Sequence, residues 1–223
     1  MNATETLQAM RERHSVRSYD GTPLTADEIA ALQDLIDTCN EEGGLHIQLV
    51  VGEPKAFSGG KARYGKFSGV VNYLAFVGPK GAEERIGYYG EKIVLRATQL
   101  GLGTCWVALT FSKVKGAYEV GAGERLHLVA AIGHGTVAGA AHKVRPVEDV
   151  SSYDGDAPEW FTSGVEAALL APTAMNQQKF RFEGEGNAVR TKAGLGFYTK
   201  IDLGIAKYHF EIGAGEENFV WAS

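Results

Sequence analysis

Residues 93–103, IVLRATQLGLG, and residues 205–215, IAKYHFEIGAG, share a pattern of apolar residues and glycines at a constant separation of 112 positions. The matched pairs are Ile93 with Ile205, Leu100 with Ile212, Gly101 with Gly213 and Gly103 with Gly215. Each stretch has the apolar spacing of a helix and ends in glycine, a common helix stop. Two explanations of this pattern stay open: an internal repeat, and a chance match of two ordinary helices. If the repeat is real, the chain is a pseudo-dimer within itself whose halves share one sheet system.

The surrounding segments predict a chain of mixed helices and strands. Thr25 and Glu28 have the spacing of a capping box, ahead of a helix that Gly43-Gly44 ends. The other predicted helices cover residues 5–13, 90–100, 160–170 and 202–212, and the predicted strands cover residues 47–51, 70–78, 126–132 and 180–182. A loop over 135–158 separates this block from a C-terminal one. If the repeat is real, residues 1–150 form the main copy and residues 157–223 a partial second copy.

Composition describes an ordinary globular protein with an excess of glycine. The 223 residues are 44% hydrophobic and 22% charged, with 29 glycines, roughly twice the usual ~7%. The net charge of −5 makes nucleic acid a poor candidate partner. The charged first 30 residues show no signal peptide and no apolar run suits a membrane span, so we expect a cytoplasmic protein. Cys39 and Cys105 are expected to be isolated thiols, although one bridge stays open.

Familiar catalytic motifs are absent from the sequence. It has no dinucleotide-binding GxGxxG, no P-loop, no nucleophile elbow, no CxxC and no HExxH. The six histidines lack metal-ligand spacing, so no metal site is expected, and His127 and His209 are interpreted as structural. Cys105 has no neighbouring base and is interpreted as a buried thiol.

Two basic clusters are candidate anion sites. Arg13, Ser15 and Arg17 alternate, so in an extended segment their side chains project to one face, where two guanidinium groups and a hydroxyl can bind a phosphate. A solvated basic turn is the alternative. Lys143 and Arg145 form a second alternating pair after the strand that ends near Gly133.

A polar loop over 171–178, APTAMNQQ, follows an apolar helix and precedes the strand at Phe180. The amides of Asn176 and Gln178 supply paired donors and acceptors, which suit the edge of a heterocycle. Helix capping and turn formation explain the same residues equally well.

Four motifs together resemble the FMN-dependent nitroreductase family. They are RHSVRSYD at 13–20, GLGTCW at 101–106, KVR at 143–145 and APTAMNQQKFRF at 171–182. The resemblance spans nearly the whole chain, but the order differs. The family places a motif of the SPSxxNxQPW type after its first helices, where this chain has DTCNEEGGL at 37–45. The chain is similar to a divergent subgroup with a C-terminal partial second copy.

The resemblance implies an α+β, nitroreductase-like fold with a mixed sheet flanked by helices. Typical members are homodimers with FMN in the interface. Here the partial second copy would supply the partner's loop within one chain. The implied assembly is one FMN per chain in a monomeric pseudo-dimer or a homodimer.

Site residues follow from the same resemblance, position by position. Arg13, His14, Ser15 and Arg17 match the phosphate and ribityl contacts, and Lys143 and Arg145 match the pair that completes the phosphate site. Ala108 and Leu109 occupy the stretch whose backbone faces flavin N5. The loop that contacts the ring is matched by Pro172, Thr173 and Asn176, with Gln178 as an addition.

The implied activity is hydride transfer from NADH or NADPH through flavin N5 to a small acceptor such as a nitroaromatic or a quinone. No nucleic acid or membrane partner is expected. Two alternatives stay open: an FMN enzyme of dehalogenase-like or oxidase-like type, and a flavin-binding protein without catalysis.

Overall fold

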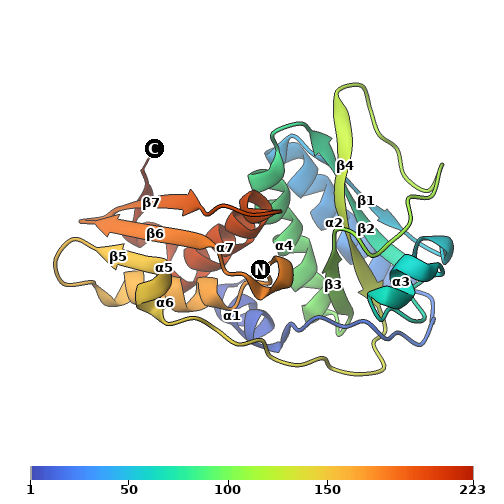
Figure 1. Ribbon diagram of the computed structural model, residues 1–223, viewed down its shortest axis with the longest axis horizontal. Coiled ribbons are helices and arrows are strands. Elements are labelled where there is room, and N and C mark those ends of the chain that lie inside the picture. Colours follow the sequence, from blue (N-terminus) through green and yellow to red (C-terminus); the bar gives the residue numbers. More distant parts are fainter. Residues whose placement is uncertain (1, 223) are drawn as a thin grey trace. The chain divides into compact units, whose positions relative to one another are not determined.

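The computed structural model describes residues 2–222, which divide into two compact units (Figure 1). Unit 1 combines the residues up to Glu12, Glu83–Lys92 and the residues from His142 onward, and unit 2 combines Arg13–Ala82 with Ile93–Ala141. Helix α4, Glu83–Gln99, contributes residues to both units. Neither unit is a continuous segment of the chain.

Unit 2 contains an antiparallel sheet of order β1-β2-β4-β3. Its strands are β1 His46–Val50, β2 Asn72–Pro79, β3 Gly103–Val107 and β4 Glu124–Gly133. Its helices are α2 Ala26–Gly43, η1 Lys55–Phe57 and α3 Gly60–Tyr64. The first seven residues of β2 are buried, as the continuous apolar run predicts. The β2–β4 register shifts between Phe76 and Val77.

The predicted capping box at the start of α2 is confirmed. The Thr25 side chain accepts a hydrogen bond from the Glu28 N–H at 3.2 Å, and the Glu28 carboxylate accepts one from the Thr25 N–H at 2.7 Å. Gly44 ends the helix in the left-handed conformation, with φ 56°. Beyond this end, the Asn40 side chain bonds both backbone polar groups of Ile47, at 2.9 and 2.7 Å. Local signals therefore set both ends of α2 and its link to β1.

Unit 1 contains a mixed sheet of order β5-β6-β7-β8 (Figure 1). Its strands are β5 Ser151–Tyr153, β6 Phe180–Glu185, β7 Ala188–Ala193 and β8 Val220–Trp221. Its helices are α1 Ala3–Glu12, α5 Val147–Val150, α6 Glu159–Leu169, η2 Ala174–Asn176, α7 Thr199–Ala214 and η3 Glu216–Asn218. β6 pairs antiparallel with β7 and parallel with β5. The core is aromatic, with Phe210 on α7 stacked on Phe182 at 4.7 Å.

Two glycines allow close contact between the first half of α4 and α7 within unit 1. A Cβ atom on Gly87 would lie 2.1 Å from the Ile201 carbonyl oxygen, and one on Gly204 would lie 1.9 Å from that of Glu84. Glycine in a helix interior costs about 1 kcal/mol relative to alanine, but only glycine permits such an approach. The contacts are reciprocal, since Gly204 minus Gly87 and Ile201 minus Glu84 both equal 117. Reciprocal contacts of this kind are the pattern of a two-fold interface.

Several predicted boundaries were wrong. α4 begins at Glu83, seven residues before the predicted start at Gly90, because Gly87 is a contact residue inside the helix and not a helix boundary. The 135–158 loop contains α5 and β5, while β3, β7 and β8 were not predicted. Gly213 lies inside α7, which Gly215 ends, whereas Gly101 follows α4. Pairing Gly101 with Gly213 at a separation of 112 therefore matches non-equivalent positions.

Among residues 2–222, no helix combines the length and apolar character needed to cross a membrane.

Candidate functional site

The segment 13–19 of unit 2 lies against β3 without forming a regular strand. Ser15 makes an isolated parallel bridge to Thr104, and the Val16 N–H donates to the Thr104 carbonyl at 2.9 Å. Tyr19 is buried, and its hydroxyl donates to the Val16 carbonyl at 2.8 Å. These bonds fix the backbone that carries Arg13, Ser15 and Arg17.

Three of the predicted phosphate-site side chains act on the pKa of the Cys105 thiol. Burial raises the pKa of this thiol, and Arg17, the Ser15 side chain and Arg13 each oppose that rise. Arg13 is 4% exposed, whereas Arg17 is exposed and lies over the Phe67 ring at 5.9 Å. The segment thus carries two guanidinium groups and a hydroxyl. The Arg13 guanidinium lies inside the unit, and the Arg17 guanidinium lies at its surface. The buried thiol with a raised pKa agrees with the interpretation of Cys105 as unreactive.

The turn that precedes the second basic pair packs on this segment. Gly139 has φ 77°, and a Cβ there would lie 2.8 Å from the His14 Cβ and 3.1 Å from the Ser15 carbonyl oxygen. A side chain at position 139 would therefore collide with the segment that carries the cations. Part of the glycine excess has this explanation, because close backbone approach requires glycine.

Ala108 and Leu109 follow the end of β3 in a loop that continues to residue 123, where β4 follows. The Leu109 side chain is 73% exposed, and Ala108 is half-buried. Thr110 packs against Gly65, where a Cβ would lie 2.6 Å from the threonine hydroxyl oxygen. The Leu109 side chain therefore points outward, while the next residue, Thr110, is held against Gly65.

In unit 1, the amide of Gln178 joins two sequence clusters. Gln178 is 2% exposed; its Nε2 donates to the Lys143 carbonyl and to Asn176 Oδ1, both at 2.7 Å. Its Oε1 accepts from the Arg145 N–H at 2.9 Å. Asn176 Nδ2 also donates to the Lys143 carbonyl at 2.8 Å. Both N–H groups and the carbonyl of Gln178 are thus engaged within unit 1, where they hold the backbone of the basic pair.

The loop that carries these amides has an unusual backbone. Met175, Asn176 and Gln178 have φ of 51°, 53° and 44°, in the left-handed region. Each such residue costs about 1 to 3 kcal/mol and persists only where its surroundings hold it. Thr173, half-buried like Pro172, helps to hold the loop, because its hydroxyl accepts from the Gln178 N–H at 3.1 Å. Strain of this kind clusters at functional sites, and we interpret the loop as one.

Asp202, in the first turn of α7, holds the other side of the loop. Its Oδ1 accepts from the Ala174 N–H at 3.0 Å and its Oδ2 from the Gln177 side chain at 2.7 Å. The residue is 3% exposed, and burial raises its pKa to about 6 while these two hydrogen bonds oppose the rise. Sequence reasoning missed Asp202, whose only signal is an acid in the first turn of a helix.

The titration of Asp202 predicts a change in stability between about pH 4 and pH 6. The pKa is about 6 in the folded chain against an ordinary 3.8, so in this window the folded state retains a proton that the unfolded state loses. The contribution of Asp202 to the free energy of unfolding therefore falls as the pH rises, by at most about 3 kcal/mol.

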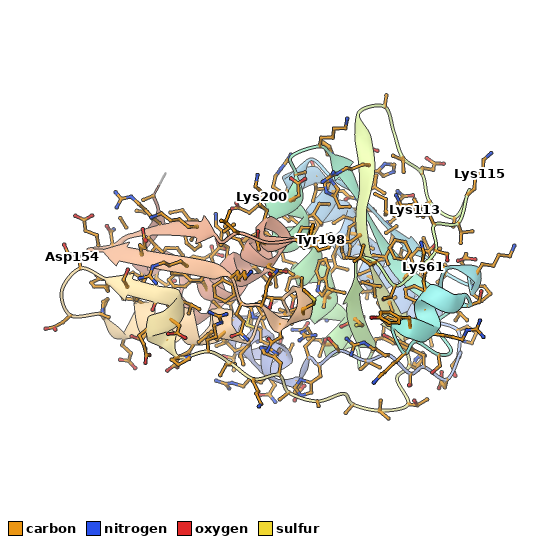
Figure 2. The ribbon with its side chains drawn as sticks, in the orientation of Figure 1. Lys61, Lys113, Lys115, Asp154, Tyr198 and Lys200 are labelled. Atoms are coloured by element: carbon orange, nitrogen blue, oxygen red, sulfur yellow. The ribbon has the colours of Figure 1, made fainter. Side chains whose placement is uncertain are left out.

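Urea unfolding of wild type and Asp202→Asn from pH 4 to pH 7 measures this contribution. Relative to the variant, wild type should lose stability as the pH rises. Asp154→Asn, at an exposed turn (Figure 2), controls for the loss of a carboxyl group. A difference between wild type and Asp202→Asn that is constant across the range contradicts the prediction.

Three large apolar side chains lie exposed around the same loop. Met175, Leu195 and Phe197 are 91%, 93% and 82% exposed. Gln177 Nε2 donates to the Phe197 carbonyl at 2.9 Å, and Lys179 Nζ donates to that of Leu195 at 3.0 Å, which ties the two loops together. Clustered apolar exposure of this kind is typical of binding surfaces.

The two histidines interpreted as structural are bonded to the scaffold. His127 Nε2 lies 3.0 Å from the Pro79 carbonyl oxygen. His209 is fully buried, with Nδ1 at 3.1 Å from the Ala167 carbonyl oxygen and Nε2 at 3.1 Å from the Glu91 carboxylate. In residues 2–222, no group of three or more histidine, cysteine, aspartate or glutamate side chains could hold a metal ion.

Comparison with solved structures defines the class of fold. A nitroreductase structure from Thermotoga maritima matches with a TM-score of 0.66 at 22% identity, covering 97% of this chain and 85% of that one. The mixed α+β architecture is therefore the nitroreductase fold, as the resemblance predicted. The family model described as "Putative TM nitroreductase" matches residues 5–214. The chain belongs to this nitroreductase family.

Shorter nitroreductases match less of the chain. A structure from Desulfovibrio desulfuricans in complex with FMN is 16% identical, covers 65% of this chain and 93% of its own, and has a TM-score of 0.49. A structure from Bacteroides fragilis with bound FMN is 18% identical, covers 64% and 94% respectively, and has a TM-score of 0.45. A comparison with curated proteins found no match.

Proposed function

We propose that the protein is an FMN-dependent oxidoreductase that passes hydride from NADH or NADPH to a small acceptor such as a nitroaromatic or a quinone. One observation carries the proposal: the segment that bears Arg13, Ser15 and Arg17 is held against β3 beside Cys105, whose pKa all three lower, in a chain of the nitroreductase family. Guanidinium groups with a hydroxyl are the donors that a phosphate monoester requires. The residues present therefore fit FMN.

Each unit supplies a set of residues to this role. In unit 2, Arg13, Ser15 and Arg17 would bind the phosphate, His14 the ribityl chain, and the backbone at Ala108 and Leu109 the N5 edge. In unit 1, the proposed flavin-binding residues are Lys143, Arg145, Pro172, Thr173, Asn176 and Gln178. The contacts of Gln178 support a positioning task, since it fixes the backbone of the basic pair.

Bound FMN would supply the hydride-accepting and hydride-donating chemistry. The chain's own residues would bind and orient it. A backbone N–H near Leu109 would stabilise negative charge at the N5 edge. The exposed cations Lys143 and Arg145 would neutralise the negative charge of the phosphate. This reaction requires no side-chain general base, which agrees with a sequence that lacks catalytic dyads.

A direct test is to purify the protein and examine its visible spectrum. We expect bound yellow flavin that bleaches under anaerobic conditions with NADH or NADPH and recovers its colour with a quinone. Bound FMN without bleaching supports a non-catalytic flavoprotein instead. A colourless protein that does not bind added FMN contradicts the proposal.

Arg17→Ala is expected to weaken FMN binding. Loss of a charge-assisted hydrogen bond costs about 1.5 to 3 kcal/mol, which corresponds to a dissociation constant roughly 10 to 150 times higher. Fluorescence titration of the flavin-free protein with FMN measures this dissociation constant. Lys80→Ala, an exposed cation beyond the end of β2, is the matched control. Equal affinities of wild type and Arg17→Ala contradict the phosphate assignment.

We further propose one flavin per chain, in an assembly where residues 157–223 act as a partial second copy of residues 1–150. The reciprocal helix contacts at Gly87 and Gly204 support this relation. Flavin stoichiometry together with the mass in solution tests it. One FMN per monomer is expected of a pseudo-dimer. We also propose a cytoplasmic location.

A further inference from the structure

One region of unit 2 concentrates positive charge. We call it the basic face; its cations are Lys55, Lys61, Arg63, Lys66, Lys113 and Lys115, all exposed. They come from the segment that joins β1 to β2 and from the loop that follows β3. Figure 2 shows Lys61, Lys113 and Lys115 pointing away from the unit at its α3 end.

The two segments of the basic face are packed together. The Ser112 N–H donates to the Ala56 carbonyl at 2.8 Å, and the Phe57 and Phe111 rings stack at 6.4 Å. These contacts join η1 to the loop after β3, so the two segments that carry the cations are packed together in unit 2. The same loop carries Leu109, which the proposed function places at the flavin edge.

Little negative charge balances the basic face. Residues 53–69 and 109–119 carry six cations and two acids, Glu53 and Glu119, a net charge of +4. The chain as a whole carries −5, so its remainder carries −9. The Glu53 carboxylate is engaged by the Lys55 and Ala56 N–H groups, at 2.8 and 2.9 Å. Within the described part of the chain, none of the six cations forms an ion pair.

The cations diverge rather than converge. Lys61 and Arg63 are two positions apart on α3, which turns them about 200° from each other around the helix axis. They cannot close on a single phosphate group, whereas a broad acidic surface can meet several of them at once. Tyr64, 87% exposed, and Leu109, 73% exposed, lie among the charges. A tyrosine and an aliphatic side chain within a charged rim are typical of protein interfaces.

We propose that the basic face docks an acidic electron-carrier protein that reduces the flavin. This inference rests on the proposed function, because the loop of Leu109 links the face to the flavin edge. Two reduced one-electron carriers would each dock and deliver one electron. The two electrons, with one proton from solvent, reduce one bound FMN, and both carriers leave oxidised. Opposite charges on the two proteins accelerate their encounter.

The test measures anaerobic bleaching of the FMN-loaded protein by reduced plant-type [2Fe–2S] ferredoxin, a small acidic iron–sulfur protein. The variant Lys61→Glu/Lys113→Glu/Lys115→Glu should lower the second-order rate constant at low salt by at least about tenfold, and 0.5 M NaCl should lower the wild-type rate toward that of the variant. The control Lys80→Glu reverses one charge at the opposite end of β2 and should leave the rate unchanged. The variant's rate with NADPH should equal that of wild type.

Three results overturn the proposal: equal ferredoxin rates for variant and wild type at low salt, an equal loss in Lys80→Glu, or a selective loss with NADPH, which assigns the face to nucleotide phosphate. Ferredoxin binding measured by calorimetry separates this inference from the proposed function, since it requires no flavin. Salt-sensitive binding that the triple variant loses supports the docking surface even if the chain binds no FMN. Absence of binding to FMN-loaded wild type at low salt overturns it.

Discussion

Replacing Phe210 with alanine is expected to destabilise unit 1 by about 4 kcal/mol. Phe210 is fully buried, stacks on Phe182, and meets the Phe161, Phe219 and Trp221 rings at 5.8, 5.1 and 5.4 Å. Removing it leaves a cavity that these rigid rings cannot fill. Urea unfolding followed by tryptophan fluorescence measures the loss, because Trp160 and Trp221 belong to the same unit.

Phe197→Ala is the matched control for this cavity. The Phe197 side chain is 82% exposed, so its removal should change the free energy of unfolding by less than about 0.5 kcal/mol. Equal destabilisation by the two substitutions would show that the aromatic cluster is not the core of unit 1.

Replacing Gly204 with alanine is expected to cost about 3 kcal/mol, at the upper end of the usual range for overpacking. The added methyl would lie 1.9 Å from the Glu84 carbonyl oxygen and 2.8 Å from the Tyr88 nitrogen. Both are backbone atoms, so no side-chain rotation can relieve the contact. The helices must separate, which loosens the neighbouring hydrogen bond between Tyr88 and the buried Glu211 carboxylate.

Thermal unfolding of Gly204→Ala against Gly60→Ala tests this contact. Gly60 is the first residue of α3, and a Cβ there meets no atom within 4 Å, so alanine should be neutral or slightly stabilising. Gly87→Ala meets the Ile201 carbonyl oxygen at 2.1 Å and should resemble Gly204→Ala. Wild-type stability in both helix-crossing variants would disprove the close approach of α4 and α7.

Much of the scaffold follows from local sequence. The Thr25–Glu28 spacing and Gly44 determine both ends of α2, because capping bonds and the left-handed turn involve residues within one helical turn. The continuous apolar run predicts β2, and helical periodicity predicts α6 and the middle of α7. The short strands β5 and β8 were missed, because they have three and two residues and pair with segments about thirty residues away along the chain. β7 was also missed, although it pairs with its chain neighbour β6.

The candidate site divides in the same way. Alternation within 13–17 predicts that Arg13, Ser15 and Arg17 act together, since their relation depends only on an extended backbone. All three lower the pKa of the Cys105 thiol, and their shared phosphate role stays a prediction. The joining of residues 143–145 to the 171–178 loop depends on the side-chain amides of Gln178 and Asn176, across more than thirty residues. Asp202 holds the other side of the loop and carries no motif.

By itself the sequence determined the capped helix α2, the buried strand β2, the cationic segment at 13–17 and the family motifs, all of which are properties of neighbouring residues. Tertiary structure alone decided which glycines serve as helix stops and which as contact points. It also decided that Gln178 and Asp202 hold a strained loop, and that the lysines of two distant segments form one basic face. Each of these depends on atoms that meet only when segments far apart in the chain pack together, so no local pattern records them.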